Sequence, residues 1–426
     1  MGWPRSLRVL IAAALLPWFA ALSHAQDQDT PNEEPTSPSK LNIASWGGAY
    51  TQSQQIAFFD PFKKETGVDV SVVTHGGKFG PLDKDGGSGL KGWDLVDMGF
   101  SDVEIACRNG LLETIDSGQL AAGSDGTTAR EDYLPRTLHK CGVPSVAWSS
   151  IIVYDRRAFD GRTPKSASDF FDLQAFPGKR ALPKNPRYVL ELALLADGVE
   201  PNDVYAQLVT EKGLTRALKK LDSIGDDIIW TDNRFQPLEL LGEQKVTMAT
   251  AFSGRVFNTI VAKNQPFGIV WDGQIYELDV WAIPKTSSNK EGALKFIAFA
   301  TRPDRLAEQT KWFPYGPVRK SALAMVGKHA QVDIDMASYL PTSAANFPGA
   351  LKFDGSFWAS QEKRLGKRFT NWLESPPAET AKDSVDTPER ASRPSQPAGA
   401  SADRPAAAAN NGAAPVDRKK PRRRDP

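Results

Sequence analysis

The sequence predicts an α/β fold in which two lobes enclose a cleft. Short apolar strands alternate with helical patterns along most of the chain, which is typical of mainly parallel sheets flanked by helices. The region from about residue 40 to residue 373 has no Pro/Ser-rich linker and is long for a single core. Two apolar stretches, at 143–154 and 278–284, look like crossings of the chain between the lobes.

The N-terminus has the pattern of a secretory signal peptide. Two arginines precede an apolar run at 9–22, and small residues follow at 23–25. An uncleaved membrane anchor is the alternative, but the run is short and is interrupted by Pro17. We therefore expect residues 1–25 to be removed during export to the periplasm, and residues 26–40 to form a flexible tether.

The C-terminal segment 374–426 is rich in Pro and Ala and ends in a basic cluster. It has too little apolar surface to offset the entropy of ordering, so we expect a disordered tail. The basic end could contact anionic lipid or a cell-wall polymer, or it could be solvated without a role. The whole chain has 52 basic and 51 acidic residues, a balance that argues against nucleic acid as a partner of the folded part.

The first element is a strand from Leu41 that stops at Gly47 and Gly48, with a helix starting near Thr51. In an open α/β sheet, ligands bind just beyond the carboxyl ends of the strands. This turn would therefore hold Trp46 and Tyr50 over a cleft. The alternative is an ordinary turn whose aromatic residues cap the core.

The first helix should end near Gly67 and be broken at Pro61. A strand is expected at 68–73 and another at 93–98, which places Asp97 at a carboxyl end. The later elements follow in order: a helix at 102–109, the crossing strand at 143–154, helices starting at 166–169 and at Asn185-Pro186, a helix around 214–221, a strand end at 228–230, a helix at 236–241, a strand at 246–252, strands at 267–271 and 278–284, and a helix behind a capping box at 288–291.

Cys107 and Cys141 are the only two cysteines, and an even pair in a secreted chain predicts a disulfide. Two buried thiols are the alternative. The four histidines stand apart from one another, and we find no metal-binding or nucleophile motif. We therefore expect no cofactor, no metal and no catalysis, although scattered carboxylates leave an extracytoplasmic enzyme as a rival hypothesis.

Aromatic and polar residues recur where the predicted strands end. Stacked aromatic rings together with carboxylates suit an organic cation. Arg255 suits a carboxylate, or it braces a buried acid. For each of these residues, packing within the core or between the lobes is the alternative to ligand contact. The set comprises Trp46, Tyr50, Asp97, Trp230, Phe252, Arg255, Trp271 and Asp279.

At these residues the chain resembles the extracellular solute-binding proteins of bacterial ABC importers, in the spermidine/putrescine-binding branch. The segments that carry the resemblance are Ser45–Tyr50, Phe62–Val70, Trp93–Val96, Gly110–Leu112, Phe252–Arg255, Asp279–Pro284 and Asn289–Ala293. The resemblance implies a type II periplasmic-binding-protein fold that closes on a small-molecule solute and docks on a permease in the inner membrane. It implies lobe 1 at 41–147 and 279–322, and lobe 2 at 148–278 and 323–373. We expect a monomer.

The resemblance also carries over to single residues. Trp46 and Tyr50 match the family's first-lobe aromatic residues, and Asp279 matches the carboxylate that holds an amine. Phe252 stands where the polyamine binders have a tryptophan, and Glu277 where they have another. Residues 184, 185 and 188 stand where they have an acidic pair for the far ammonium group, which weakens the case for a long polyamine.

We therefore expect a periplasmic protein that captures an amine-bearing, polyamine-like solute. The alternatives are a binder of an amino-acid-type or other carboxylate-bearing solute, which Arg255 favours, and a protein of another class that acts on the envelope through its basic tail or as an enzyme. The predicted ligand-binding residues are Trp46, Gly47, Gly48, Tyr50, Asp97, Tyr188, Trp230, Phe252, Arg255, Glu277, Asp279 and Tyr315.

Overall fold

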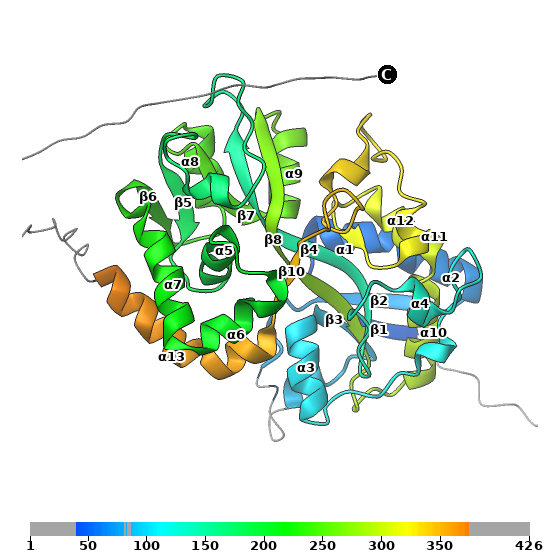
Figure 1. Cartoon of the computed structure of the whole chain (residues 1–426). Helices are drawn as coiled ribbons and strands as arrows, with labels where there is room; N and C mark the ends of the chain where they lie inside the picture. The colour runs from blue at the N-terminus through cyan, green and yellow to red at the C-terminus, as the bar shows by residue number, and fades with distance from the viewer. Residues whose placement is uncertain (1–39, 81, 83–86, 375–426) are drawn as a thin grey trace, which may run out of the picture. The chain divides into compact units, whose positions relative to one another are not determined.

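The computed structural model describes residues 40–80, 82 and 87–374, which belong to one compact unit (Figure 1). The predicted signal peptide, all of the predicted tether except Lys40, and the predicted tail beyond Glu374 lie outside the described residues. Within the described part of the chain, no helix is long and apolar enough to span a membrane.

The core of the fold is a ten-stranded mixed sheet, in which eight strands follow the order β2-β1-β3-β8-β4-β7-β5-β6, while β9 pairs with β4 and β10 pairs with β8. The strands are β1 (Lys40–Ser45), β2 (Asp69–Thr74), β3 (Leu95–Gly99), β4 (Val143–Asp155), β5 (Arg180–Pro183), β6 (Ile228–Thr231), β7 (Met248–Phe252), β8 (Phe267–Ala282), β9 (Gly316–Pro317) and β10 (Leu351–Lys352).

The two ends of the sheet are parallel, and the middle is antiparallel. Strands β1, β2 and β3 pair in parallel at one end, and β5 pairs in parallel with β6 and β7 at the other. The long strands β4 and β8 pair antiparallel through the middle (Figure 1). The predicted crossing at 143–154 is thus a strand, but the predicted separate strands at 267–271 and 278–284 are one continuous strand.

Helices flank the sheet (Figure 1). The α-helices are α1 (Gly48–Gln54), α2 (Asp60–Thr66), α3 (Phe100–Arg108), α4 (Ala129–Asp132), α5 (Val189–Ala196), α6 (Val204–Val209), α7 (Glu211–Asp222), α8 (Gln236–Gly242), α9 (Ser253–Val261), α10 (Lys290–Ala300), α11 (Pro303–Thr310), α12 (Lys320–Leu323) and α13 (Gly355–Glu374).

Several helix starts differ from the predicted ones for local reasons. The hydrogen bonding changes to π-type over Gln55–Phe59, just before Pro61, so α1 and α2 are joined by a π turn rather than separated by a break. The helix expected at Asn185 begins at Val189, because Tyr188 takes a left-handed conformation with φ of 67°. The cap of α10 is Asn289, whose side chain accepts from Gly292 N.

Two large hydrophobic cores lie along the sheet. The first draws on residues 41–147 and 276–322 and contains the fully buried Trp281 and Phe296. The second draws on residues 152–275 and 351–369 and contains the buried Trp358 and Phe369. These cores agree with two lobes, whose boundaries remain a prediction.

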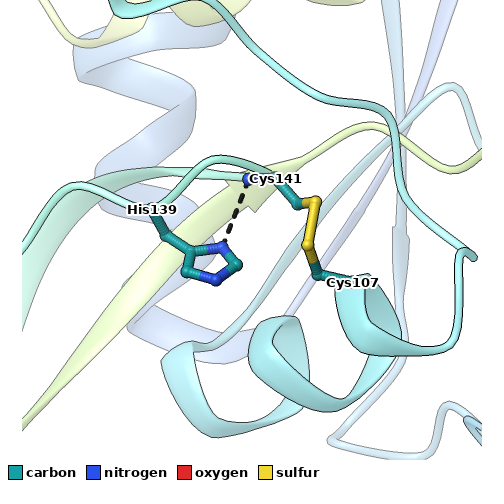
Figure 2. A group of neighbouring side chains, drawn as sticks. All are labelled: Cys107, His139 and Cys141. Carbon is teal, nitrogen blue, oxygen red and sulfur yellow. Dashed lines mark hydrogen bonds between the residues drawn. A yellow bond between two sulfur atoms is a disulfide. The ribbon is translucent and has the colours of Figure 1, made fainter.

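The predicted disulfide between Cys107 and Cys141 is present and joins the end of α3 to the segment before β4 (Figure 2). The Cα atoms are 5.8 Å apart. His139 lies beside it, and its Nδ1 accepts a hydrogen bond from Cys141 N at 3.2 Å. Although two cysteines and a histidine could hold a metal ion, both sulfur atoms are bonded to each other here and cannot serve as thiolate ligands.

Candidate ligand-binding site

A cavity of about 1220 Å³ is lined by residues from both core regions. Strand ends and helix starts supply part of its walls, as expected for an open α/β sheet, and the interiors of β4 and β8 supply another part. Nine of the predicted residues line the cavity: Trp46, Gly47, Tyr50, Tyr188, Phe252, Arg255, Glu277, Asp279 and Tyr315.

The other three predicted residues lie elsewhere. Gly48 is exposed at the first position of α1 and does not line the cavity. Asp97 is buried beneath Tyr50, whose hydroxyl donates to it. Trp230 packs edge-on against Phe369 and Trp372, with ring centroids 5.7 and 5.9 Å away. Only long-range packing reveals this, because a tryptophan at a strand end has the same local pattern in a core and in a cleft.

The turn after β1 is shaped by Gly47, which has a φ of 89°. A Cβ at this position would lie 2.6 Å from Cγ2 of Thr74, so only glycine fits. Gly47 N donates to Oγ1 of Thr51 at 2.8 Å and thereby ties the turn to α1. The adjacent Trp46 ring contacts His75, with centroids 4.8 Å apart.

Two aspartates are buried on this side of the cavity: Asp279 lines it, and Asp97 lies behind Tyr50. The Oδ2 atom of Asp97 accepts from Tyr50 Oη at 2.8 Å and from Gln54 Nε2 at 2.6 Å. Burial nevertheless raises the pKa of Asp97 to about 7. Burial and the charges of Asp97 and Glu277 raise the pKa of Asp279 well above its usual range. This side of the cavity is therefore acidic and poorly solvated, which favours a cationic ligand group.

A third carboxylate, that of Glu277, lies on β8 two residues before Asp279. Ser101 Oγ donates to its Oε1 atom at 2.9 Å. Burial raises the pKa of Glu277 to about 7. Trp148 on β4 is the direct cross-strand partner of Glu277, so the two side chains share a face of the sheet.

Aromatic rings form one wall of the cavity. The Trp148 and Phe252 ring centroids are 5.1 Å apart in an edge-on arrangement, and those of Tyr188 and Phe252 are 5.8 Å apart. Tyr188 also stacks on Phe353 at 4.8 Å. The left-handed conformation of Tyr188 is unfavourable for a bulky residue, and such strain is concentrated at functional sites.

The opposite charge comes from Arg255 at the start of α9. Its guanidinium lies 4.2 Å from the centroid of the Phe235 ring, and Arg234 is its neighbour in the cavity wall. Burial and the charge of Arg234 lower the pKa of Arg255. Within the described ranges, neither arginine forms an ion pair. Burial and the charge of Asp279 raise the pKa of Tyr315, while the charge of Arg255 opposes this shift.

Several lining residues were not predicted. Trp148 could have been found, because it lies in the apolar crossing strand as the only indole. Arg234 and Phe235 lie in a loop without periodicity, and Ser101 and Asp102 are ordinary helix-start residues. Their proximity to the cavity depends on packing of distant segments and has no local signal.

The comparisons with known proteins agree with this geometry. Residues 57–342 match the family model described as bacterial extracellular solute-binding protein. A gamma-aminobutyric acid (GABA)-binding protein of Pseudomonas aeruginosa is 35% identical over 354 residues, which is 83% of this chain and 93% of that protein. A spermidine/putrescine-binding periplasmic protein of Escherichia coli is 27% identical over 70% of this chain and 80% of its own length.

Solved structures are similar as well. An ABC transporter substrate-binding protein of Bradyrhizobium japonicum has a TM-score of 0.63 at 26% identity, covering 78% of this chain and 99% of that one. A solved GABA receptor has a TM-score of 0.61 at 28% identity, covering 78% of this chain and 97% of its own. These similarities confirm the predicted fold class, location and solute-binding role. The chain therefore belongs to the family of bacterial extracellular solute-binding proteins, and the cavity between its two cores is the candidate site for the solute.

Proposed function

We propose that this protein captures a small solute that carries both a cationic amine and a carboxylate, and delivers it to the permease of an ABC importer. The observation that carries this proposal is the charge arrangement of the cavity. Carboxylates lie in one part of the cavity wall and Arg255 lies in another. Among the described residues, neither these carboxylates nor Arg255 is neutralised by an ion pair. Short amino acids with well-separated charges, such as GABA, have the matching pattern.

Asp279 is the proposed partner of the amine. A buried carboxylate without a cation is unfavourable, and a bound ammonium group restores the missing charge. The aromatic rings of Trp148 and Phe252 exclude water there and add cation–π attraction.

Arg255 is the proposed partner of the carboxylate. Its guanidinium can donate two parallel hydrogen bonds to a carboxylate, and the Phe235 ring holds it in place. Arg234 adds positive charge at the same side. A polyamine has no group for this arginine, so the arrangement favours an amino acid over a long polyamine.

The relatives support this solute class, since one is named for binding GABA and others for binding spermidine and putrescine. We further propose that the solute is released unaltered, so that the protein is not an enzyme. An enzymatic role would be favoured if a bound solute, recovered after incubation and analysed by mass spectrometry, were chemically changed.

Calorimetric titration of the mature protein with GABA, putrescine and spermidine tests the proposal. Asp279→Asn should weaken binding of every amine solute by about tenfold or more, because it removes the buried charge. Arg255→Gln should weaken the binding of GABA by a similar factor but leave the affinity for putrescine unchanged. Arg130→Gln, an exposed change outside the cavity, is the matched control and should affect none.

Equal affinities for wild type and Asp279→Asn would refute the amine site. An equal loss of GABA and putrescine in Arg255→Gln would refute the carboxylate site. If deletion of residues 376–426 abolished the protein's activity in cells while solute binding was intact, the alternative of an envelope-interacting protein would be favoured instead.

A further inference from the structure

Two acidic side chains lie next to each other on one strand of the cavity wall. Glu277 and Asp279 are two residues apart on β8, and both line the cavity. Because side chains alternate along a strand, residues two apart face the same side. Among the residues that the structure describes, no lysine or arginine forms an ion pair with either carboxylate. A single alkylammonium group can be bound by Asp279 alone, so Glu277 needs a separate explanation.

The surroundings of Glu277 orient its carboxylate and leave acceptor sites free. Ser101 Oγ occupies one site on Oε1 at 2.9 Å. A Cβ at position 99 would lie 3.3 Å from the same oxygen, and one at position 355 would lie 2.0 Å from Ser101 Oγ. Glycines at both positions therefore make room for this pair. Tyr188 and the Ser101 backbone also interact with this carboxylate, and with about four acceptor sites it can still accept from a ligand.

The aromatic wall beside Glu277 suits a flat cation. Trp148 faces Glu277 directly across the β4–β8 ladder. The Trp148 ring also lies near the Tyr188 ring, with the ring centroids 6.5 Å apart. A guanidinium is planar, is weakly hydrated, stacks on aromatic faces and carries five N–H donors in its plane. It can therefore lie against these rings while it donates to two carboxylates.

We propose that Glu277 and Asp279 together select a guanidinium group, so that the transported solute is a short guanidino acid rather than a simple amino acid. This inference rests on the proposed function and refines it, since Arg255 would still hold the carboxylate of the solute. The guanidino counterpart of GABA, 4-guanidinobutyrate, has the required groups. Glu277 is then a specificity-determining residue.

The test compares wild type and Glu277→Gln, each titrated calorimetrically with 4-guanidinobutyrate, GABA and putrescine. Wild type should prefer 4-guanidinobutyrate over GABA by about tenfold or more, because hydrogen bonds to a charged group are strong. Glu277→Gln should lower the affinity for 4-guanidinobutyrate at least about tenfold more than the affinity for GABA. Thermal unfolding of both proteins verifies that the variant is folded.

Glu113→Gln removes the same charge outside the cavity and should change neither affinity. The inference is overturned if GABA binds while 4-guanidinobutyrate binds no better, or if Glu277→Gln weakens both by the same factor. It is also overturned if putrescine is the tightest ligand of the wild type and its affinity falls most in Glu277→Gln. That result would assign Glu277 to a second ammonium group. If none of the three solutes binds, the proposed function itself fails, and this inference fails with it.

Discussion

Asp97 illustrates how a single buried group couples stability to pH. Its pKa is raised to about 7 by burial, whereas an exposed aspartate in the unfolded chain titrates near 4. The folded protein therefore binds more protons than the unfolded chain between about pH 4 and 7. The free energy of unfolding should consequently fall as the pH rises through this window.

Asp97→Asn keeps the shape of the side chain and removes its titration. We expect the free energy of unfolding to fall less steeply between about pH 4 and 7 in this variant. The difference in slope corresponds to the loss of up to about one proton bound by the folded state. Urea unfolding at several pH values measures this slope. Asp69→Asn is the control, because Lys63 lowers the pKa of the exposed Asp69 and its titration lies below the window. Parallel slopes for wild type and Asp97→Asn would contradict the prediction.

At the residue scale, nine of the twelve predicted ligand-binding residues line the cavity, and their part in binding stays a prediction. Trp46 and Tyr50 follow the end of β1, Asp279 lies within β8, and all three line the cavity. Trp230 has the same local pattern, but α13 returns to cover it and turns it into a core residue. The fate of a strand-end side chain thus depends on which distant segment packs over it, and the local sequence around that side chain carries no record of this.

The turn between β1 and α1 depends on two glycines with different roles. Gly47 has a φ of 89° and would place a Cβ 2.6 Å from Thr74, whereas Gly48 has a φ of 62° and would place a Cβ in open space. A positive φ costs other residues roughly 1–2 kcal/mol at Gly48, whereas Gly47, with a ψ of −178°, lies in a region that is essentially restricted to glycine. Only Gly47 adds a steric conflict.

Gly47→Ala should therefore reduce the free energy of unfolding by clearly more than Gly48→Ala, which should lose roughly 1 kcal/mol. It should also weaken solute binding, because the displaced turn carries Trp46. Chemical denaturation of the two variants side by side gives the difference. Equal losses would mean that the contact with Thr74 is relieved by movement of its side chain.

At the element scale, alternation of strands and helices was visible in the sequence, but continuity was not. The sequence suggested two strands, at 267–271 and 278–284, and Asp272 and Gly273 lie between them. Instead, β8 runs through this point with an irregularity, in which its residues 271–274 lie opposite the single β4 residue Ile151. A glycine within a paired strand often marks such an irregularity, and the partner strand decides the outcome.

At the scale of the whole molecule, solute binding should be linked to protons. Burial raises the pKa values of Glu277 and Asp279, and a cationic solute favours their ionised forms. Binding should therefore release protons, and the affinity for a cationic solute should rise with pH between about 6 and 8.

Calorimetry in two buffers of different ionisation enthalpy, at pH near 6.5, counts the released protons. We expect a positive count that shrinks when Glu277→Gln and Asp279→Asn are combined, provided that residual binding is measurable. Proton uptake on binding, or an affinity that falls with pH, would contradict the linkage.

The way the cores are assembled has a consequence for synthesis and export. The first core needs residues up to Ala322, and the second needs Trp358 and Phe369 from the last described helix. Neither core can be completed by a nascent chain until nearly all of these residues have been made, and contacts so distant in sequence form slowly. A polypeptide that stays open this long is well suited to being threaded through a narrow translocation pore, and to folding only on the far side of the membrane.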